Sequence, residues 1–286
     1  MEAWRQVFEV ELQRVSASLY AETGDFHAAC RYALGGQGKR TRPLLALAAA
    51  EACGVDLWRL ALPAAVAVEM VHTYSLVHDD LPCMDDDALR RGRPTTHTIY
   101  GDAVALLAGD ALLTDAFSFL AERGASASDQ RVGMVAALAR AAGGSGMVYG
   151  QSLDMSWTGR SGYAADDLDA IHRNKTGQLV AASCLLGAWA AGASAEQRGR
   201  MQSFGANIGL AFQIIDDLLD DTQRIGKTPG KDKEAGKLTY LSVMTAEQAR
   251  VRAQTLTAEA MHSLESFGPS AAALRELASQ LLERTF

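Results

Sequence analysis

Residues 58–87 read WRLALPAAVAVEMVHTYSLVHDDLPCMDDD, an apolar stretch that ends on aspartates. Its apolar residues recur at helical spacing through many turns, which predicts a long helix. Pro63 falls in the first turns of this helix, where proline is tolerated. Asp79 and Asp80 end the helix, although a carboxylate there faces the negative end of the helix dipole. The stretch therefore predicts a helix whose acidic end nothing local compensates.

Helical spacing of apolar residues continues along the rest of the chain. A first helix is predicted to have one apolar face, made by Val7, Val10, Leu12 and Val15. Further helices are predicted at residues 44–53, 58–78, 102–122, 129–142, 145–156, 165–173, 175–191, 195–223, 246–265 and 269–284. Clean strand alternation is absent, and no composition shift or low-complexity linker divides the chain. We therefore predict an all-α fold that forms a single domain over residues 1–286.

A second group of aspartates lies inside another apolar helix. Asp216 and Asp220 are four residues apart and share a helix face, which Asp217 borders. Like charges at that spacing repel each other, and a divalent cation is the simplest way to relieve the repulsion. Magnesium is often held by one or two carboxylates, with waters and substrate phosphates completing its shell. The two aspartate clusters together therefore predict magnesium binding.

Two other interpretations of the aspartate clusters are less consistent with the sequence. A solvated acidic turn explains a single cluster equally well, but it explains poorly two clusters that both adjoin apolar sequence. An EF-hand is excluded, because Met84 occupies the loop position that needs glycine and Arg90 the position that needs glutamate.

Basic residues follow the glycine-rich turn at residues 35–38, recur after each aspartate cluster, and stand at the start of the helix predicted at 175–191. They are Lys39, Arg42, Arg90, Arg91, Lys175, Lys227 and Lys237. Arginine binds phosphate through paired hydrogen bonds, and lysine acts as a point charge. The start of a helix, where main-chain N–H groups are unpaired, also suits a phosphate. The pattern predicts a site for two diphosphates, one held through magnesium and one held directly by cations.

The composition limits the remaining classes of protein. The net charge is -7, so the overall field does not attract nucleic acid or an anionic membrane. The longest apolar run, Leu179–Ala193, is too short for a membrane span of about 20 residues. No signal peptide is visible at the N-terminus, and the four cysteines are scattered without a CxxC pair. We therefore expect a cytoplasmic protein with no nucleic-acid partner and no membrane span.

Five motifs in order resemble those of the trans-prenyltransferases, the short-chain isoprenyl diphosphate synthases, over nearly the whole chain. They are GKRTRP at 38–43, SLVHDDLPCMDDDALRRGRPTTH at 75–97, LLAGDALLTDAF at 106–117, KTGQL at 175–179 and FQIIDDLLD at 212–220. The resemblance implies a helical bundle around a deep central cavity and a homodimer. It also implies condensation of isopentenyl diphosphate with dimethylallyl diphosphate and then with geranyl diphosphate.

The resemblance further implies which residues bind metal. The first aspartate motif is Asp79, Asp80 and Asp85, and the second is Asp216, Asp217 and Asp220. In this family the two motifs and the allylic diphosphate bind three Mg2+ ions. Asp79 and Asp85 would be direct ligands.

Substrate contacts are implied in the same way. The allylic diphosphate would be held by Arg90, Lys175 and Lys227, with Lys237 as a further site lysine. Isopentenyl diphosphate would be held by Lys39, Arg42, His72 and Arg91. Thr176 and Gln213 would face the reacting carbons. The allylic diphosphate would ionise to a carbocation, which the isopentenyl double bond attacks before a proton leaves.

Product length is expected to depend on the floor of the cavity below the first aspartate motif. Tyr74 and Ser75 precede Asp79 by about one helical turn. A ring at Tyr74 would block a growing chain, and Tyr-Ser at these positions resembles the farnesyl-forming members of the family. Geranylgeranyl-forming relatives often carry a smaller or more flexible residue at the Tyr74 position. The sequence therefore predicts farnesyl diphosphate, with geranylgeranyl or geranyl diphosphate as alternatives.

Three functions of other kinds fit the sequence less well. A class I terpene cyclase normally replaces the second aspartate motif and needs no cations at Lys39 and Arg42. An HD-type phosphohydrolase, suggested by His78 before Asp79, would need further metal-binding residues in a suitable context. An inactive regulatory partner of a synthase would be expected to have lost one of the two motifs, and both are intact.

Overall fold

The computed structural model describes residues 1–125, 127–157, 159–160, 162–224 and 239–282, with only the backbone described at 220–224 and 281–282. It confirms the predicted all-α fold. The α-helices are α1 (Glu2–Leu19), α2 (Asp25–Leu34), α3 (Thr41–Cys53), α4 (Leu62–Asp79), α5 (Thr96–Tyr100), α6 (Asp102–Arg123), α7 (Ser128–Ala142), α8 (Met147–Trp157), α9 (Ala165–His172), α10 (Gln178–Ala190), α11 (Ala195–Arg224), α12 (Ala246–Ser263) and α13 (Ala272–Leu282). Shorter helical turns are η1 (Leu57–Ala61), η2 (Arg173–Gly177), η4 (Tyr240–Ser242) and η5 (Glu265–Ala271).

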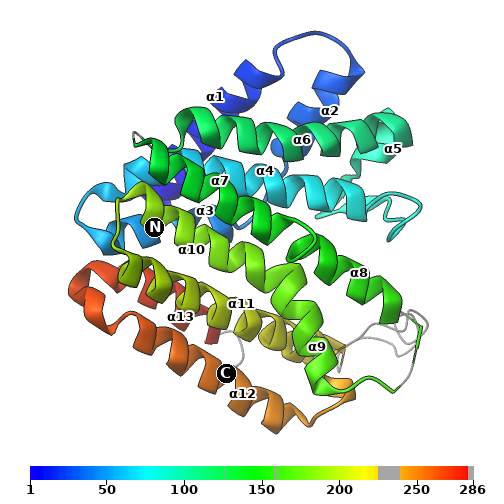
Figure 1. Cartoon of the computed structure of the whole chain (residues 1–286). Coiled ribbons are helices and arrows are strands. Elements are labelled where there is room, and N and C mark those ends of the chain that lie inside the picture. Colours follow the sequence, from blue (N-terminus) through cyan, green and yellow to red (C-terminus); the bar gives the residue numbers. More distant parts are fainter. Residues whose placement is uncertain (126, 158, 161, 225–238, 283–286) are drawn as a thin grey trace.

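Two apolar helices, α4 and α10, lie at the centre of the bundle. α4 packs against α3 and α6, α10 packs against α3, α7 and α11, and α12 packs against α11. Figure 1 shows the helices stacked from α6 in the upper part of the bundle to α12 at its lower edge. Nearly every residue of α10 is buried, as expected for a helix that is apolar on all sides. The site described below is built on these two central helices.

Close contacts between helices depend on glycines of α10 and α11. A Cβ atom at Gly187 of α10 would overlap the carbonyl oxygen of Ala46 in α3. A Cβ atom at Gly205 of α11 would lie 2.6 Å from the Cα atom of Ala181 in α10. The backbones of α3, α10 and α11 can therefore approach each other only because these positions carry no side chain.

Within the part of the chain that the structure describes, two helical stretches are long and apolar enough to cross a membrane, judged by length and composition alone. In Leu57–Asp79, 67% of the apolar window is buried inside the protein, as in the core helix of a globular protein. In Asp102–Arg123 only 33% is buried, and Leu106 and Leu107 of α6 are 46% and 54% exposed. α6 therefore presents an apolar face to the outside of the bundle.

Two local features differ from the predicted helices. Residues 173–177 form a π-helical turn between α9 and α10, so that Lys175 lies inside a continuous helical segment and does not begin one as predicted. Strand β1 (Leu89–Arg90) pairs with β2 (Arg93–Pro94) in a short antiparallel hairpin. Each strand has two residues, which is too short for an alternating pattern to be visible in the sequence.

Replacing Gly187 with alanine is expected to lower the free energy of unfolding by about 1–3 kcal/mol, since overpacking of a tight contact typically costs that much. The clash is with a backbone atom, which cannot rotate away. Gly199→Ala is the matched control, because Gly199 of α11 has no atom within 4 Å of its Cβ position. That change is expected to be neutral or stabilising. Calorimetric Tm values would test the pair, and equal losses at both positions would contradict the role given to Gly187.

Candidate active site

Two cavities meet near the middle of the bundle. The larger, of about 440 Å³, is lined by residues of α4 and α8, among them Tyr74, Ser75, Asp79, Met147 and Lys175 from the π turn. The smaller, of about 280 Å³, is lined among others by Lys39 of the loop before α3, Leu44 of α3, Val180 of α10, and Ile208 and Phe212 of α11. Arg42 and Thr176 line both cavities. Ligands bound in the two cavities would therefore meet beside these two side chains.

Arg42 and His72 form the polar wall where the cavities meet. Burial and the charges of Arg42 and Arg91 hold the pKa of His72 well below its ordinary value, so its ring is neutral and can accept a hydrogen bond. Nη1 of Arg42 lies 3.4 Å from Nε2 of His72. Nε of Arg42 is buried and has no hydrogen-bond partner within the described residues. A buried guanidinium with an unused donor is suited to an anion.

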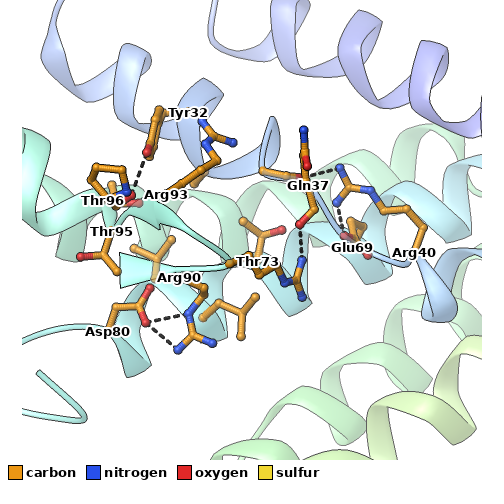
Figure 2. A pocket seen from close by; sticks show the side chains of 16 residues that line it. Tyr32, Gln37, Arg40, Glu69, Thr73, Asp80, Arg90, Arg93, Thr95 and Thr96 are labelled. Carbon is orange, nitrogen blue, oxygen red and sulfur yellow. Dashed lines mark hydrogen bonds and ion pairs between the residues drawn. The ribbon is translucent and has the colours of Figure 1, made fainter. Parts of the chain in front are cut away.

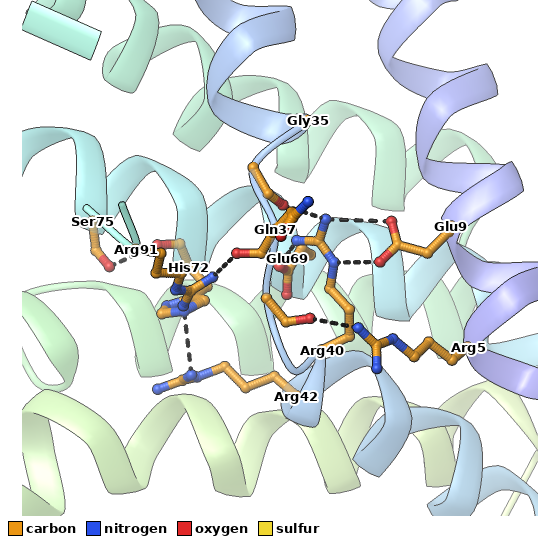
Figure 3. A network of polar contacts seen from close by, with 12 residues as sticks. Arg5, Glu9, Gly35, Gln37, Arg40, Arg42, Glu69, His72, Ser75 and Arg91 are labelled. Carbon is orange, nitrogen blue, oxygen red and sulfur yellow. Dashed lines mark hydrogen bonds and ion pairs between the residues drawn. The ribbon is translucent and has the colours of Figure 1, made fainter. Parts of the chain in front are cut away.

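Arg91 lies against the loop that leads into α3. Its Nη1 atom donates to the carbonyl oxygen of Gln37 at 2.5 Å, as Figure 3 shows. A Cβ atom at Gly38 would lie 2.5 Å from the same Nη1 atom. Glycine at position 38 therefore leaves room for the Arg91 guanidinium. Lys39, Arg42 and Arg91, three of the four residues predicted for isopentenyl diphosphate, are thus cations that lie close together on this side.

Asp79 brings a carboxylate to the wall of the larger cavity. Burial raises its pKa to about 6, with the charge of Lys175 acting against that rise and the charge of Asp85 adding to it. The main-chain N–H of Asp85 donates to the carbonyl oxygen of Asp79 at 2.8 Å, which closes the turn between them. Asp79, Asp85 and Lys175 are thus near each other, and the desolvated Asp79 carboxylate is stabilised by any cation that binds there.

Asp80 is directed differently from its neighbour. It is 4% exposed and accepts a hydrogen bond from Nε of Arg90 at 2.7 Å, with Nη2 of Arg90 at 2.5 Å. Figure 2 shows this pair at the edge of a third cavity, of about 80 Å³, between α4 and the β1–β2 hairpin. The structure therefore pairs two predicted site residues with each other, and Arg90 is held on the hairpin by Asp80.

The π turn places Lys175 and Thr176 at the cavity wall. Nζ of Lys175 donates to Asp154 of α8 at 2.5 Å, and the Thr176 hydroxyl donates to Oε1 of Gln213 in α11 at 3.2 Å. A Cβ atom at Gly150 of α8 would overlap the main-chain nitrogen of Lys175. The extra residue of a π turn is frequently found at functional sites, and here it joins α8, α10 and α11 at one point.

The second aspartate motif is described in part. Asp217 is 8% exposed and accepts a hydrogen bond from the main-chain N–H of Tyr240 at 2.8 Å, so it anchors the turn that leads to α12. Asp216 is half-buried on α11. For Asp220 only the backbone is described, and Lys227 and Lys237 lie outside the described residues.

The donor set fits magnesium better than a metal held entirely by protein. Among the described residues, no group of three or more His, Cys, Asp or Glu side chains is gathered closely enough to hold a metal ion. Magnesium does not require such a group, since one or two carboxylates with phosphate oxygens and water suffice. Asp79 and Asp85, beside the cationic Lys175, fit that kind of shared site.

Several residues of the site were not identified from the sequence. Asp154 pairs with Lys175, and the Oε1 atom of Gln151 is buried in the cavity wall without a partner within the described residues. Arg40 and Glu69 form a buried ion pair beneath the loop. Glu69 carried a visible signal, because it is the one charged residue in an otherwise apolar run from 60 to 71. Asp154 carried none, since a single aspartate in a half-polar helix is ordinary.

The chain is similar to known proteins over most of its length. Residues 24–273 match the family described as Polyprenyl synthetase. The chain is 46% identical over 248 residues to geranylgeranyl pyrophosphate synthase 4 of Arabidopsis thaliana, covering 85% of this chain and 66% of that protein. It is 41% identical over 286 residues to a dimethylallyltranstransferase of Fischerella ambigua, covering 98% and 82%. The crystal structure of an FPP/GFPP synthase from Zymomonas mobilis superposes with a TM-score of 0.87 at 37% identity, covering 97% of each chain.

Replacing Asp79 with asparagine is expected to raise the Tm of the protein in EDTA at pH 7.5. The pKa of Asp79 is raised from 3.8 to about 6 by burial, so the native state binds more protons than the unfolded state between these pH values. The ionised carboxylate therefore destabilises the native state increasingly as the pH rises through that range, and fully above it. Asparagine carries no charge, so the gain is expected to be larger at pH 7.5 than at pH 4.5.

Calorimetry at the two pH values would test this expectation. Asp85→Asn, at an exposed position of the same turn, is the control and is expected to change the Tm less. A Tm of Asp79→Asn that falls by the same amount at both pH values would show that desolvation of this carboxylate is not important.

Proposed function

This chain belongs to the polyprenyl synthetase family, and we propose that it joins isopentenyl diphosphate head to tail to dimethylallyl or geranyl diphosphate. The observation that carries this proposal is the pair of cavities that meet at Arg42 and Thr176. One cavity has a cationic rim, and the other combines a carboxylate with a lysine. Two diphosphate esters held at these rims would place their reacting carbons together.

Isopentenyl diphosphate is proposed to bind directly to cations at the meeting point of the cavities. Lys39, Arg42 and Arg91 would contact its phosphates, and neutral His72 would orient Arg42. The unused Nε donor of Arg42 supports this assignment. Direct binding of a diphosphate by arginine and lysine needs no metal.

The allylic diphosphate is proposed to bind through magnesium on the opposite side. Asp79 and Asp85 from one motif and Asp216 from the other would hold the ions, three by family expectation, and Lys175 and Arg90 would contact phosphate oxygens. Bound magnesium would neutralise the charge that develops on the departing diphosphate. Asp80 and Asp217 are already bonded to Arg90 and to the Tyr240 main chain, so we assign them to positioning. Assignment of Asp220, Lys227 and Lys237 to the same site rests on the motif resemblance alone.

The chemistry of the chain's own residues is electrostatic and positional. The allylic C–O bond breaks, and its electron pair leaves with the diphosphate, whose new charge Lys175 and Arg90 stabilise. The hydroxyl of Thr176 and the amide of Gln213, hydrogen-bonded to each other, present dipoles to the carbocation. The isopentenyl double bond supplies the electrons of the new C–C bond, and the proton that is lost passes to the released diphosphate. The apolar cavity walls exclude water, which would otherwise capture the cation.

Tyr74 is proposed to set the product at farnesyl diphosphate. It lines the larger cavity and is 5% exposed. Its ring meets His78 edge-on, with centroids 5.6 Å apart, and His78 is itself seated over Gly109 of α6, where a Cβ atom would overlap the imidazole. The tyrosine is therefore supported from behind and forms a firm floor.

Geranylgeranyl diphosphate is the second candidate product, and the names of relatives favour it. The Arabidopsis relative and one from Cyanophora paradoxa, 44% identical, are both named as geranylgeranyl diphosphate synthases. Met147 and Met155 of α8 also line the larger cavity, and flexible thioethers adapt readily to ligands of different length.

A homodimer in the cytoplasm is the proposed form of the protein. The apolar outward face of α6, with Leu106 and Leu107 half exposed, is suited to a second copy of the chain. The four cysteines are free thiols, which is usual in a reducing compartment.

The proposed function is tested by incubating the protein with isopentenyl diphosphate, Mg2+ and either dimethylallyl or geranyl diphosphate. Dephosphorylated products are then identified by chromatography and mass spectrometry. Farnesol from both allylic substrates, lost in EDTA, is the expected result. A cyclic hydrocarbon, or release of phosphate without C–C bond formation, would contradict the proposal.

Replacing Tyr74 with alanine is expected to shift the main product from fifteen to twenty or more carbons, because the floor of the cavity is removed. Tyr74→Phe keeps the ring and removes only the hydroxyl, so its product is expected to match that of the unaltered protein. The alcohols released after dephosphorylation give the product length. An unchanged distribution for Tyr74→Ala would show that another residue limits the chain.

A further inference from the structure

The loop between α2 and α3 is held by arginines at residues 35–38. Four consecutive carbonyl oxygens, those of Gly35, Gly36, Gln37 and Gly38, each accept a hydrogen bond from a different arginine: Arg93 at 3.2 Å, Arg40 at 2.7 Å, Arg91 at 2.5 Å and Arg5 at 3.1 Å. Figure 3 shows Arg5, Arg40 and Arg91 converging on the loop. Since residues 36–40 have no regular secondary structure, these side chains replace the main-chain bonds that would otherwise fix the loop.

Arg40 differs from the other three because it belongs to the loop itself. Its backbone is left-handed, with φ 51° and ψ 34°, a conformation that is uncommon for residues other than glycine. Its side chain lines the third cavity, of about 80 Å³, beside Glu69, whereas the adjacent Lys39 lines the cavity of about 280 Å³ on the substrate side. Neighbouring residues thus face opposite sides of the loop, and Arg40 is placed to support the loop without reaching a substrate.

The guanidinium of Arg40 connects three separate parts of the protein. Its Nε atom donates to Glu9 of α1 at 2.8 Å, and its Nη1 atom donates to Glu69 of α4 at 2.5 Å. Its Nη2 atom donates to the carbonyl oxygen of Gly36. The side chains of Arg40 and Glu69 are each 5% exposed. Breaking the bond between them would therefore leave two buried charges without their direct partner.

Glu69 links this support to Arg42. Burial lowers the pKa of Arg42, and the negative charge of Glu69 acts against that lowering. Arg42 follows Arg40 by two residues and lies in the first turn of α3. The same glutamate therefore anchors the loop through Arg40 and helps Arg42 to remain charged.

We propose that Arg40 is a positioning residue for the isopentenyl diphosphate site, which ties its own loop to α1 and α4 and thereby fixes Lys39 and Arg42. The inference rests on the proposed function. A lysine at position 40 would keep the charge but could not bond Glu9, Glu69 and the Gly36 carbonyl at once, because it lacks the planar fork of donors. The allylic side of the site shares none of these bonds, so its binding is expected to be unaffected.

The test is steady-state kinetics of Arg40→Lys, with isopentenyl and geranyl diphosphate varied separately and the Tm recorded. We expect the KM for isopentenyl diphosphate to rise at least 10-fold while the KM for geranyl diphosphate changes less than 2-fold. Arg14→Lys is the matched control, because Arg14 also pairs with a glutamate, Glu11, but at an exposed place on α1. It is expected to leave both KM values unchanged.

A folded Arg40→Lys protein with an unchanged KM for isopentenyl diphosphate, or with both KM values raised equally, would overturn the inference. If Arg40→Lys does not fold, Glu9→Gln carries the same test, since Glu9 is the more exposed partner of Arg40. An unchanged KM for isopentenyl diphosphate in folded Glu9→Gln would also overturn the inference. Absence of C–C bond formation by the unaltered protein would remove the proposed function and this inference together.

Discussion

Charge balance inside an apolar bundle is the constraint on which the rest of the structure depends. A charge moved from water into a protein interior is very unfavourable unless a partner accompanies it. Helix α4 meets this constraint turn by turn. Glu69 pairs with Arg40 and His72 accepts from Arg42, and Asp80, the residue directly after the helix, accepts from Arg90. Asp79 is the exception, because burial raises its pKa to about 6, and this exception marks the place where a cation and an anionic substrate would complete the balance.

Close contacts between helix backbones fix the positions of these charged side chains. Gly187 brings α10 against α3, Gly205 brings α11 against α10, and Gly150 brings α8 against the π turn. Lys175 and Thr176 project from that turn toward the two cavities, and Thr176 bonds to Gln213 on α11. The positions of the polar groups are therefore set by main-chain packing, which explains how an apolar bundle can hold a polar site without a dedicated domain for it.

Much of the fold could be predicted from the sequence, because apolar spacing reports directly on which helix faces are buried. The predicted helix at 195–223 corresponds to α11, and the one at 58–78 corresponds to η1 and α4. The π turn at Lys175 could not be predicted, because the helix that follows it, α10, is apolar on all sides and a one-residue shift of register leaves no visible mark there. Helix α2 was also missing from the prediction; most of its residues are apolar, but it has only 10 residues, so its apolar pattern spans few helical turns.

Charge that stands out against apolar sequence singled out Asp79 and Asp216 as candidates, and the structure places Asp79 at the wall of the larger cavity. Partners that are distant in sequence could not be predicted in this way, and Asp154 with Lys175 or Glu9 with Arg40 are examples. Such pairs depend on how two helices pack against each other, and the sequence of either helix alone does not determine that packing. The same limit applies to Asp80 and Asp217, whose bonds to Arg90 and to the Tyr240 main chain could not be read from their own segments.

The most direct test of the account is calorimetric binding of geranyl diphosphate with Mg2+ and with EDTA, beside the same pair of titrations with isopentenyl diphosphate. Mg2+ is expected to strengthen binding of geranyl diphosphate about 100-fold or more, which corresponds to about 2.7 kcal/mol, and to change binding of isopentenyl diphosphate little. Equal affinity for geranyl diphosphate in EDTA would contradict the claim that the aspartate side of the site binds its substrate through metal.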